Sequence, residues 1–466
     1  MALPKVVILS SNVLTDRMML YNEFLQVLSK KAEIIIWPVA WTEHAYQDLS
    51  VDNVKVEAFP KVSEMKFRLA LLRRLNDYVW DAKNINKTRR LFWKYSRDNV
   101  KSYEYLFLTA VFLINIFGLA NWVERISRKF YINENRSPEA YNRLKIIKPD
   151  LLVMTSPLLT TSEPGIVNSA IQLKIPVMAF ISSWDNLSTK SRFMFDFDGY
   201  ILWSTQMKKD LDIFYPYARK KPYYIVGAPQ FDVFKNPEYY ITKEEFCKQY
   251  DFDPLKPIVL YTLGSPNMYN ELPGAIEFVK RAAKNEMVDI QIIVRPHPAK
   301  FNDPGLVEIP KLYSKVVIQK DSNPKDSKVV FTHDKSKIIE WVNSFKYSDI
   351  VIHISSSTAI DGAIFDKGII NLDFDPSGIK SKMAWHGTHT IHHYKPVVDL
   401  GGMLTASNVD EMIEAVNKYI QNPELSKAER KRMVDFTCEY TDGNCGERYA
   451  NAIIDFLSKE NITKVL

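Results

Sequence analysis

Short apolar runs alternate with helix-like stretches along this chain, and that alternation limits the fold more than any other feature of the sequence. Five runs in the first half have the length and the Val, Ile and Leu content of buried strands. They lie at residues 5–9, 32–38, 150–155, 175–181 and 199–203. Stretches such as 18–31 and 161–173 separate them and have a helical pattern. The alternation predicts a parallel sheet with helices on both faces.

A second alternating set follows, so we predict an α/β protein with two doubly wound, Rossmann-like domains. Its strands are expected at 257–263, 289–295, 315–319, 349–355 and 369–374, and its helices at 273–286, 335–347, 357–367 and 408–421. The 466 residues suffice for two domains. A stretch with turn formers and little periodicity marks the joint. The predicted boundaries are 1–238 for the N-terminal domain, 239–256 for a linker and 257–440 for the C-terminal domain.

A basic, aromatic-rich segment at 60–145 interrupts the first domain and is expected to be a helical insertion. From Lys61 to Lys101, twelve Lys and Arg stand against four Asp and Glu, a local charge of +8 in a chain of +6. Such helices fit a surface that touches anionic lipid headgroups, so 60–130 is the expected contact with the inner membrane. A solvated insertion is the alternative. Nucleic acid is not an expected partner, because no known binding module is present.

Residues 103–122 of the insertion are apolar enough to raise the question of a transmembrane span. Several interruptions favour a buried or interfacial helix instead: Thr109, Asn115, Gly118 and Asn121. The opening MALPKVVILSSN is expected to form a strand and not a signal peptide. The three cysteines (Cys247, Cys438 and Cys445) match no disulfide framework or zinc pattern. We therefore expect reduced thiols in a cytoplasmic protein that is peripheral at the inner membrane.

The run DIQIIVRPHP ends a predicted strand with Arg295, Pro296, His297 and Pro298. Proline fixes φ and cannot continue the ladder, so His297 is expected beyond the carboxyl end of the strand. Ligands of doubly wound sheets bind outside those ends, where two facing domains would form a cleft. An imidazole held there can donate a hydrogen bond to phosphate or a proton to a leaving group. A strand-ending turn with an incidental histidine is the alternative.

Four hydroxyls follow another predicted strand, in the sequence SSST at 355–358. Hydroxyls and free N–H groups at a helix start form an anion site, and a simple cap needs only one hydroxyl. We therefore predict that Ser356, Ser357 and Thr358 bind phosphate. Asp361, one turn further on, either meets a ribose hydroxyl or complements the helix dipole.

Two further loops carry candidate residues. After the first strand of the second domain, Gly264 and Ser265 allow a close backbone approach to a ligand, although such turns are common. In the first domain, Asp185 in FISSWDNLSTKS is a candidate general base. Its alternative is an Asx-turn beside a packed tryptophan. Glu163, in TTSEPGI after an earlier strand, is the competing base.

The segment WHGTHTIHHY at 385–394 holds four of the eight histidines. It contains no Cys or carboxylate, and its spacing suits neither a helix face nor a usual zinc loop, so no metal is expected. A loop that closes over the ligand is the preferred interpretation, and a plain surface loop is the alternative.

Four motifs resemble those of bacterial surface-polysaccharide transferases, of the CDP-glycerol glycerophosphotransferase-like and capsule-type groups. They are VGAPQFDVF (226–234), RPHP (295–298), SSSTAIDGAIFDKGIINLDFD (355–375) and TDGNCGERYANAI (441–453). The resemblance implies a GT-B fold, with two domains facing across a cleft and a C-terminal helix at 441–466 that returns to the first domain.

The HP and SS elements are also similar to those of sialyl- and Kdo-transferases, whose donors are activated by CMP. There the histidine and the serines contact the donor phosphate, which implies that role for His297, Ser356 and Ser357; Arg295 would support it or pair locally. Those enzymes place the base in an acidic-Gly motif. This chain has FDFDGY at 195–200, whose spacing departs from that motif.

The expected function is therefore metal-independent transfer of a sugar from a nucleotide donor, with CMP- and CDP-activated sugars as candidate donors, to a surface-glycan, lipid-linked or protein acceptor. His, hydroxyl and N–H groups would stabilise the leaving nucleotide, and Asp185 or Glu163 would take the acceptor's proton. Three alternatives stay open: a polymerase that uses CDP-glycerol, a nucleotide-sugar 2-epimerase and a non-catalytic assembly scaffold.

Overall fold

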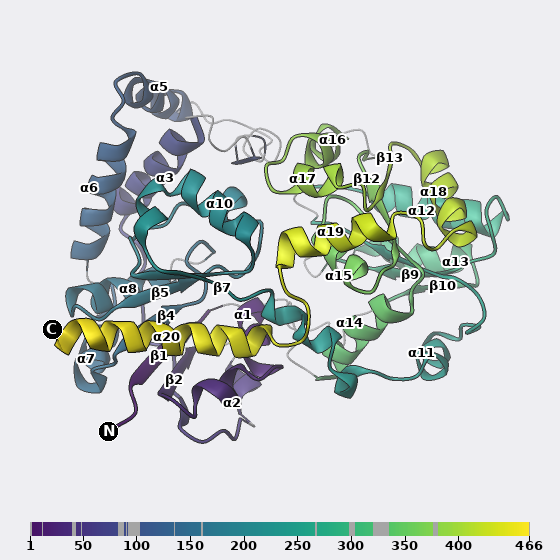
Figure 1. Ribbon diagram of the computed structural model, residues 1–466. Coiled ribbons are helices and arrows are strands. Elements are labelled where there is room, and N and C mark those ends of the chain that lie inside the picture. The colour runs from purple at the N-terminus through teal and green to yellow at the C-terminus, as the bar shows by residue number, and fades with distance from the viewer. Residues whose placement is uncertain are drawn as a thin grey trace. The chain divides into compact units, whose positions relative to one another are not determined.

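The computed structural model divides the chain into two compact units, each built on one parallel sheet (Figure 1). Unit 1 comprises 1–90, 99–235 and 438–466, and unit 2 comprises 91–98 and 236–437. The structure describes residues 2–11, 13–39, 43–47, 49–82, 88–89, 91, 103–134, 136–159, 162–265, 268–297, 303–319, 335–375 and 381–465. The predicted α/β class is confirmed.

The sheet of unit 1 has seven parallel strands in the order β3-β2-β1-β4-β5-β6-β7. The strands are β1 (Lys5–Ser10), β2 (Glu33–Pro38), β3 (Val54–Val56), β4 (Leu151–Met154), β5 (Val177–Phe180), β6 (Gly199–Leu202) and β7 (Tyr223–Ile225). All five predicted strands are present. The edge strands β3 and β7 were not predicted, because three partly exposed residues leave no readable pattern. The order reverses between β1 and β4, so their carboxyl ends form the topological switch point.

The sheet of unit 2 has six parallel strands in the order β10-β9-β8-β11-β12-β13. The strands are β8 (Ile258–Thr262), β9 (Gln291–Arg295), β10 (Val316–Ile318), β11 (Ile350–His353), β12 (Gly368–Leu372) and β13 (Leu404–Ala406). The five predicted strands are again present, and β13 is an additional edge strand. Here the switch point lies between β8 and β11.

Helices occupy the connections between the strands. Those of unit 1 are α1 (Val13–Leu20), α2 (Phe24–Leu28), α3 (Phe67–Ala82), α5 (Tyr103–Ile116), α6 (Ala120–Asn133), α7 (Pro138–Ile147), α8 (Ser162–Gln172), α9 (Asn186–Thr189), α10 (Thr205–Phe214) and α20 (Cys445–Val465). Those of unit 2 are α11 (Lys243–Tyr250), α12 (Leu272–Ala283), α13 (Ile309–Leu312), α14 (Lys335–Tyr347), α15 (Thr358–Ile364), α16 (Ser381–His389), α17 (Tyr394–Asp399), α18 (Val409–Gln421) and α19 (Lys427–Cys438). Short 3-10 turns lie at Glu43–Tyr46, Pro216–Lys220, Pro229–Phe234, Pro237–Tyr239 and Pro304–Glu308.

Two predicted segments differ from the structure. The single helix expected at 18–31 is broken into α1 and α2, because the Asn22 side chain bonds the backbone on both sides. Its Nδ2 donates to Met18 O at 2.9 Å, and its Oδ1 accepts from Phe24 N at 3.0 Å. The segment 239–256, expected as a linker, instead contributes α11 to unit 2. A capping box between Thr242 and Glu245 starts that helix.

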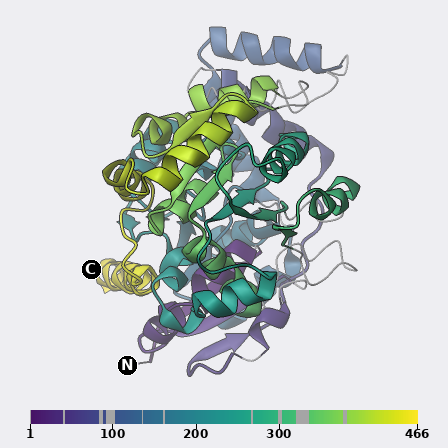
Figure 2. The same ribbon diagram turned by 90° about the vertical axis from the view of Figure 1, so that its right-hand side faces the viewer.

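The insertion of unit 1 is helical, and α3, α5, α6 and α7 form it. Gly118, with φ of +66°, ends α5 in the left-handed conformation that glycine adopts most easily. Among the described residues, no single helix is long and apolar enough to cross a membrane; Phe107–Ile116 and Ala120–Asn133 qualify only as a pair, and they are bent by 118°. Both views show α5 lying across the end of the insertion, away from the sheet (Figures 1 and 2).

Helix α20 belongs to unit 1, although it comes from the far end of the sequence (yellow in Figure 1). Its Tyr449 ring stacks on Phe24 at 4.2 Å and on Phe180 at 4.6 Å between centroids. At the start of the helix, the carboxylate of Asp232 accepts from the N–H groups of Cys445 and Gly446. This is the unit to which the resemblance assigns the C-terminal helix.

Candidate functional site

In unit 2, the ends of β8 and β11 hold several of the predicted donor-site residues close together. Thr262, the last residue of β8, has its Oγ1 3.1 Å from Oγ1 of Thr358, the first residue of α15. Gly264 follows two residues later, and a Cβ there would lie 2.8 Å from Cγ2 of Ile354. That spacing is too short for any residue but glycine unless Ile354 moves. The two chain segments therefore meet at the switch point.

His297 joins this group from β9. Thr262 is in register with Arg295, and Leu263 N donates to Arg295 O at 2.9 Å, which extends the ladder one residue beyond β8. The side chain of His297 lines a pocket together with Gly264, Tyr269, Asn270, Glu271 and Asp303. Burial lowers the pKa of His297 below its ordinary value, so its imidazole is neutral at neutral pH and one ring nitrogen carries a proton to donate.

The pocket beside His297 has a volume of about 30 Å³. That is room for a water molecule or two and not for a nucleotide, so it can form only part of a ligand site. Two carboxylates that the sequence did not single out bond to backbone N–H groups of its lining. Glu271 is buried and accepts from Gly264 N–H, and Asp375 accepts from Asn270 N at 2.7 Å. Glu271 lies outside the quoted motifs, and Asp375 ends the motif at 355–375, where nothing marks it as a partner of Asn270.

The SSST segment forms a tight bend between β11 and α15. Ser355 has φ of +42°, an uncommon value for a residue with a Cβ. Ser356 N donates to Nδ1 of His353 at 3.3 Å, and Ser356 Oγ accepts from Thr358 N at 3.3 Å. Ser357 occupies the N-cap position but its side chain makes no capping bond, and it is exposed. Its hydroxyl is therefore open to solvent at the start of α15.

Buried polar residues that the sequence did not single out form hydrogen bonds with this bend. Asn371 on β12 accepts from Ser355 N at 3.0 Å and donates to Thr388 Oγ1 at 2.7 Å. His353 is fully buried, and burial lowers its pKa to about 3. It is therefore a neutral imidazole whose Nδ1 accepts from Ser356. No pattern in the sequence distinguishes these residues from other polar residues near strand ends.

Asp361 lies on the same helix but is 6% exposed, and its Oδ1 accepts from Nε1 of Trp341 on α14 at 2.8 Å. Its burial does not suit contact with a ribose, whereas its place in the first turn of α15 suits the helix dipole. The contact with Trp341 joins α14 to α15, and we leave Asp361 out of the proposed donor site.

The switch point of unit 1 contains Glu163, in the first turn of α8. Ser11, directly after β1, donates through Oγ to Oε1 of Glu163 at 2.7 Å. After β4, Ser156 N donates to Oε2 at 2.8 Å, and Thr155 Oγ1 lies 3.3 Å from Oε1. Burial raises the pKa of Glu163 to about 7, against the opposing effect of these hydrogen bonds. A carboxylate with that pKa is suited to proton transfer near neutral pH.

Unit 1 contains a second buried carboxylate, Asp16 on α1, close to the carboxyl end of β1. The hydroxyls of Ser10 and Tyr46 both donate to its Oδ1. Burial is the main cause that raises the pKa of Tyr46, with the Asp16 charge next. The sequence did not indicate this group, because Tyr46 is 30 positions from Asp16.

The side chain of Asp185 makes no capping bond to α9, so the structure does not show the Asx-turn that was the alternative to its role as a base. Both of its carboxylate oxygens accept from nearby hydroxyls: Ser183 Oγ at 2.5 Å and Thr189 Oγ1 at 3.0 Å. Trp184 beside it is buried. Glu163 has the pKa that suits proton transfer, so it is the stronger candidate for the base.

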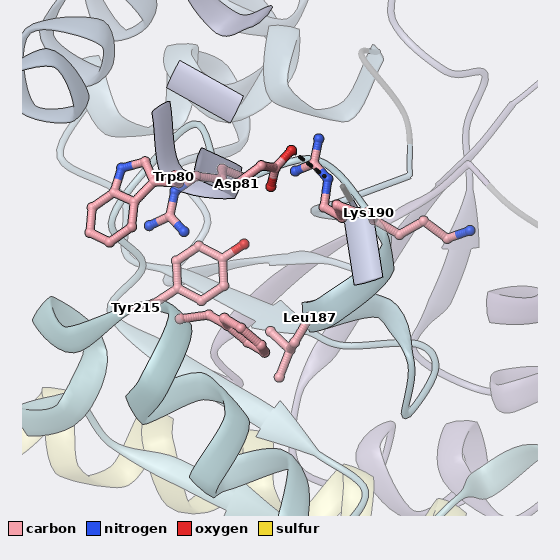
Figure 3. Close-up of a pocket in the computed structure, with 8 residues that line it drawn as sticks. Trp80, Asp81, Leu187, Lys190 and Tyr215 are labelled. Atoms are coloured by element: carbon pink, nitrogen blue, oxygen red, sulfur yellow. Dashed lines mark ion pairs between the residues drawn. The ribbon is translucent and has the colours of Figure 1, made fainter. Parts of the chain in front are cut away.

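A second pocket in unit 1 lies where α3 meets the body of the unit (Figure 3). Arg192 lines it, with its guanidinium 2.7 Å from Glu124 and 3.9 Å from the centroid of the Trp80 ring. Figure 3 shows Tyr215 beside this cluster and Lys190 extending away from it. The remaining volume is about 10 Å³, too small for a ligand. The cluster anchors the insertion.

The histidine-rich segment is helical up to His389, which corrects that part of the prediction, and His392 and His393 lie in the short turn that follows. Residues 381–389 form α16, and α17 begins at Tyr394. His389 Nε2 lies 2.8 Å from Asp373 Oδ2, and the exposed Trp385 ring lies 4.9 Å from the His389 ring. Within the described ranges, no three His, Cys, Asp or Glu side chains are grouped as a metal site would need.

No protein-family model matches the sequence, and no curated protein sequence matches it either. Solved structures do match over nearly the whole chain. A UDP-GlcNAc 2-epimerase from Neisseria meningitidis, bound to UDP-GlcNAc, is 13% identical with a TM-score of 0.55, over 97% of this chain and 100% of that one. A glycosyltransferase from Rickettsia africae is 11% identical with a TM-score of 0.53, over 98% and 100%.

The wall teichoic acid polymerase TagF, in a variant soaked with CDP-glycerol, is 10% identical with a TM-score of 0.50, over 98% of this chain and 90% of that one. At such identities the likeness shows the fold alone. The predicted GT-B class is confirmed at that level, with two parallel-sheet α/β units and a helical insertion in the first. The neighbours are enzymes that act on different substrates, so the activity of this chain is not decided by them.

Proposed function

We propose that this chain is a glycosyltransferase that moves a sugar from a nucleotide donor to a hydroxyl of an acceptor. One observation carries the proposal. In each unit, the residues suited to the chemistry gather at the topological switch point of the sheet, which is where ligands of such sheets bind. Unit 2 offers hydroxyls, a neutral imidazole and a close-approach glycine, and unit 1 offers a carboxylate with a pKa of about 7.

The donor is assigned to unit 2. His297 donates a hydrogen bond from its neutral ring to a donor phosphate, and Ser356, Ser357 and Thr358 offer hydroxyls to the same group. Arg295 adds positive charge at the end of β9. Backbone N–H groups of the loop that starts at Gly264 and Ser265 come close to the nucleotide because no side chain at Gly264 intervenes. These donors stabilise the charge that develops on the leaving nucleotide, so the proposal has no metal ion.

The acceptor is assigned to unit 1, with Glu163 as the base. The bond between the anomeric carbon and the donor phosphate oxygen breaks, and the acceptor oxygen forms the new bond to that carbon. Glu163 is buried, so the acceptor's proton passes to Ser11 Oγ while the Ser11 proton passes to Oε1 of Glu163. The nucleotide leaves with the bonding electron pair. Transfer requires both switch points to reach the same pair of substrates.

Two other activities stay open because the fold neighbours include them. A CDP-glycerol polymerase would use the same phosphate contacts, and the TagF likeness favours it. A nucleotide-sugar 2-epimerase would release an altered sugar nucleotide without an acceptor, and the Neisseria likeness favours that. A non-catalytic scaffold would bind no nucleotide.

The first test is a thermal-shift screen with CMP, CDP, UDP and GDP and their sugar or glycerol conjugates, because a ligand that binds only the folded state raises its stability. A shift with cytidine nucleotides alone supports a CMP- or CDP-activated donor. A shift with UDP or GDP keeps the transferase proposal and removes that donor class. The absence of any shift favours the scaffold.

Variants then test the assigned roles once a donor is known. His297→Ala should lower turnover by about 10²- to 10³-fold, as is usual for loss of one donor to developing charge. Glu163→Gln should lower it by about 10²- to 10⁴-fold, the usual range for a general base. Ser11→Ala should follow Glu163→Gln if it relays the proton. Asp185→Asn is the matched control and should retain most activity. Wild-type turnover in both His297→Ala and Ser357→Ala would overturn the donor site.

A further inference from the structure

The connection between α5 and α6 exposes a group of large apolar side chains that the proposed transfer reaction does not use. Phe112 is 63% exposed, Phe117 69% and Trp122 57%. Together with their exposed apolar neighbours they are called the apolar tip: Phe112, Leu113, Ile116, Phe117, Leu119 and Trp122. Isolated exposed apolar residues are ordinary, but a contiguous group marks an interaction surface.

The apolar tip is part of a well-defined turn. Gly118 takes the left-handed conformation, and Leu119 N donates to Ile114 O at 2.9 Å. Asn115 Nδ2 donates to the carbonyl of Val79 on α3 at 3.1 Å, which fixes the end of α5 against its neighbour. Figures 1 and 2 both show α5 at the end of the insertion. The fold therefore holds these side chains outward.

The charges around the tip indicate what it contacts. On α6, Arg125 and Lys129 are exposed three and seven positions after Trp122, and thus on the same helix face. Within the described part of the chain, no carboxylate pairs with these two cations, whereas Lys66 pairs with Glu134 at 2.7 Å.

An apolar group flanked by unpaired cations fits a partner with an apolar interior and an anionic surface. A second copy of this chain fits poorly, because pairing the same face with itself would bring like charges together. We propose that the apolar tip inserts into the interface of an anionic lipid bilayer, with Arg125 and Lys129 beside the headgroups. Phe and Trp on one side of basic helices are typical of interfacial insertion. This binding goes beyond the proposed transfer reaction and does not depend on it.

A fluorescent label at the tip tests the proposal on the full chain. The three natural cysteines are buried, so Phe117→Cys can be labelled selectively with an environment-sensitive dye. With vesicles of phosphatidylethanolamine and phosphatidylglycerol, the emission should shift to the blue and be quenched by brominated lipid. Ile146→Cys, at an 81% exposed position on α7, is the matched control and should not respond. No response at position 117, or an equal response at 146, would overturn the proposal.

Vesicle cosedimentation gives the independent measurement. Combining Phe112→Ser, Phe117→Ser and Trp122→Ser should reduce partitioning into anionic vesicles at least tenfold, while Ile146→Ser should not. Arg125→Glu with Lys129→Glu should abolish the preference for anionic over phosphatidylcholine vesicles. Equal binding of the wild type to both vesicle types would contradict the role of the cations. If instead the serine variant loses a dimer seen by light scattering and the wild type binds no vesicle, the tip is a protein interface.

Discussion

The hydroxyl oxygens of Thr262 and Thr358 lie 3.1 Å apart and join the end of β8 to the start of α15. Thr262 Oγ1 also bonds Ile352 O at 3.1 Å, so the two switch-point strands are tied together through one side chain. The loops that carry Gly264 and Ser357 begin at this contact. Its integrity therefore sets the geometry of the proposed donor site.

Replacing these threonines should show that they act as a pair. Thr262→Val leaves the site similar in shape but removes two hydrogen bonds, and should lower the free energy of unfolding by about 1–3 kcal/mol. Thr358→Val should cost about 1 kcal/mol. A double-mutant cycle by urea denaturation should give a coupling of at least about 0.5 kcal/mol. Additive effects would show that the contact carries no energy.

Gly264→Ala should weaken nucleotide binding, because the new Cβ would lie 2.8 Å from Ile354 Cγ2 and 3.1 Å from Tyr269 Cδ2. Either the loop or Ile354 must move. Adding Ile354→Ala, which removes the Cγ2 methyl group, should restore part of the affinity measured by calorimetry.

Gly118→Ala is the matched control for that change. Nothing lies within 4 Å of its would-be Cβ, but its φ is +66°. It should cost about 1 kcal/mol of stability through backbone strain and leave nucleotide affinity unchanged. If it impairs binding as much as Gly264→Ala does, the effect at Gly264 is not local.

Glu163 should make stability fall as pH rises. Its folded pKa of about 7 exceeds the ordinary 4.5, so between these values the folded state binds more protons than the unfolded state. The destabilisation is absent below pH 4.5, grows through that window and is constant above it, reaching about 3 kcal/mol.

Glu163→Gln cannot titrate and should lack this slope in urea unfolding measured from pH 4 to 8. In the wild type, kcat/KM should rise with an apparent pKa near 7 as the free carboxylate forms. Identical pH profiles for wild type and Glu163→Gln would contradict the assigned pKa.

The ion pair of Arg192 and Glu124 should matter for the insertion more than for the sheets. Both side chains are nearly buried and 2.7 Å apart, so Glu124→Gln leaves a buried cation undercompensated. Such a loss typically costs about 3–5 kcal/mol. Hydrogen exchange should increase first in α3 and α6. Uniformly increased exchange across unit 1 would mean that the insertion is not a separate cooperative element.

The sequence predicted the sheets well because their strands are buried on both faces and show as uninterrupted apolar runs. It missed β3, β7 and β13, which are three-residue edge strands with exposed side chains. It also missed the break in the helix at Asn22, since a hydrogen bond between a side chain and the nearby backbone does not change the hydrophobic periodicity of the sequence.

For the candidate site, the sequence indicated which residues follow a strand but not which residues form hydrogen bonds with one another. Residues after a predicted strand, such as His297 and Glu163, could be singled out because strand ends are where ligands bind. The residues that form hydrogen bonds with the candidate site could not be identified from the sequence. Ser11 is 152 positions from Glu163, and Asn371 supports Ser355 from a neighbouring strand. The resemblance to sialyl- and Kdo-transferases in the phosphate contacts stays a prediction.

The place of α20 in unit 1 has a consequence for how the chain is made. Tyr449 completes the stack with Phe24 and Phe180, so the first unit lacks part of its core until the ribosome has synthesised residues beyond 445. The second unit has its whole sheet between Ile258 and Ala406. During translation, the unit that is synthesised later can therefore finish folding first, while the earlier one waits for its last helix.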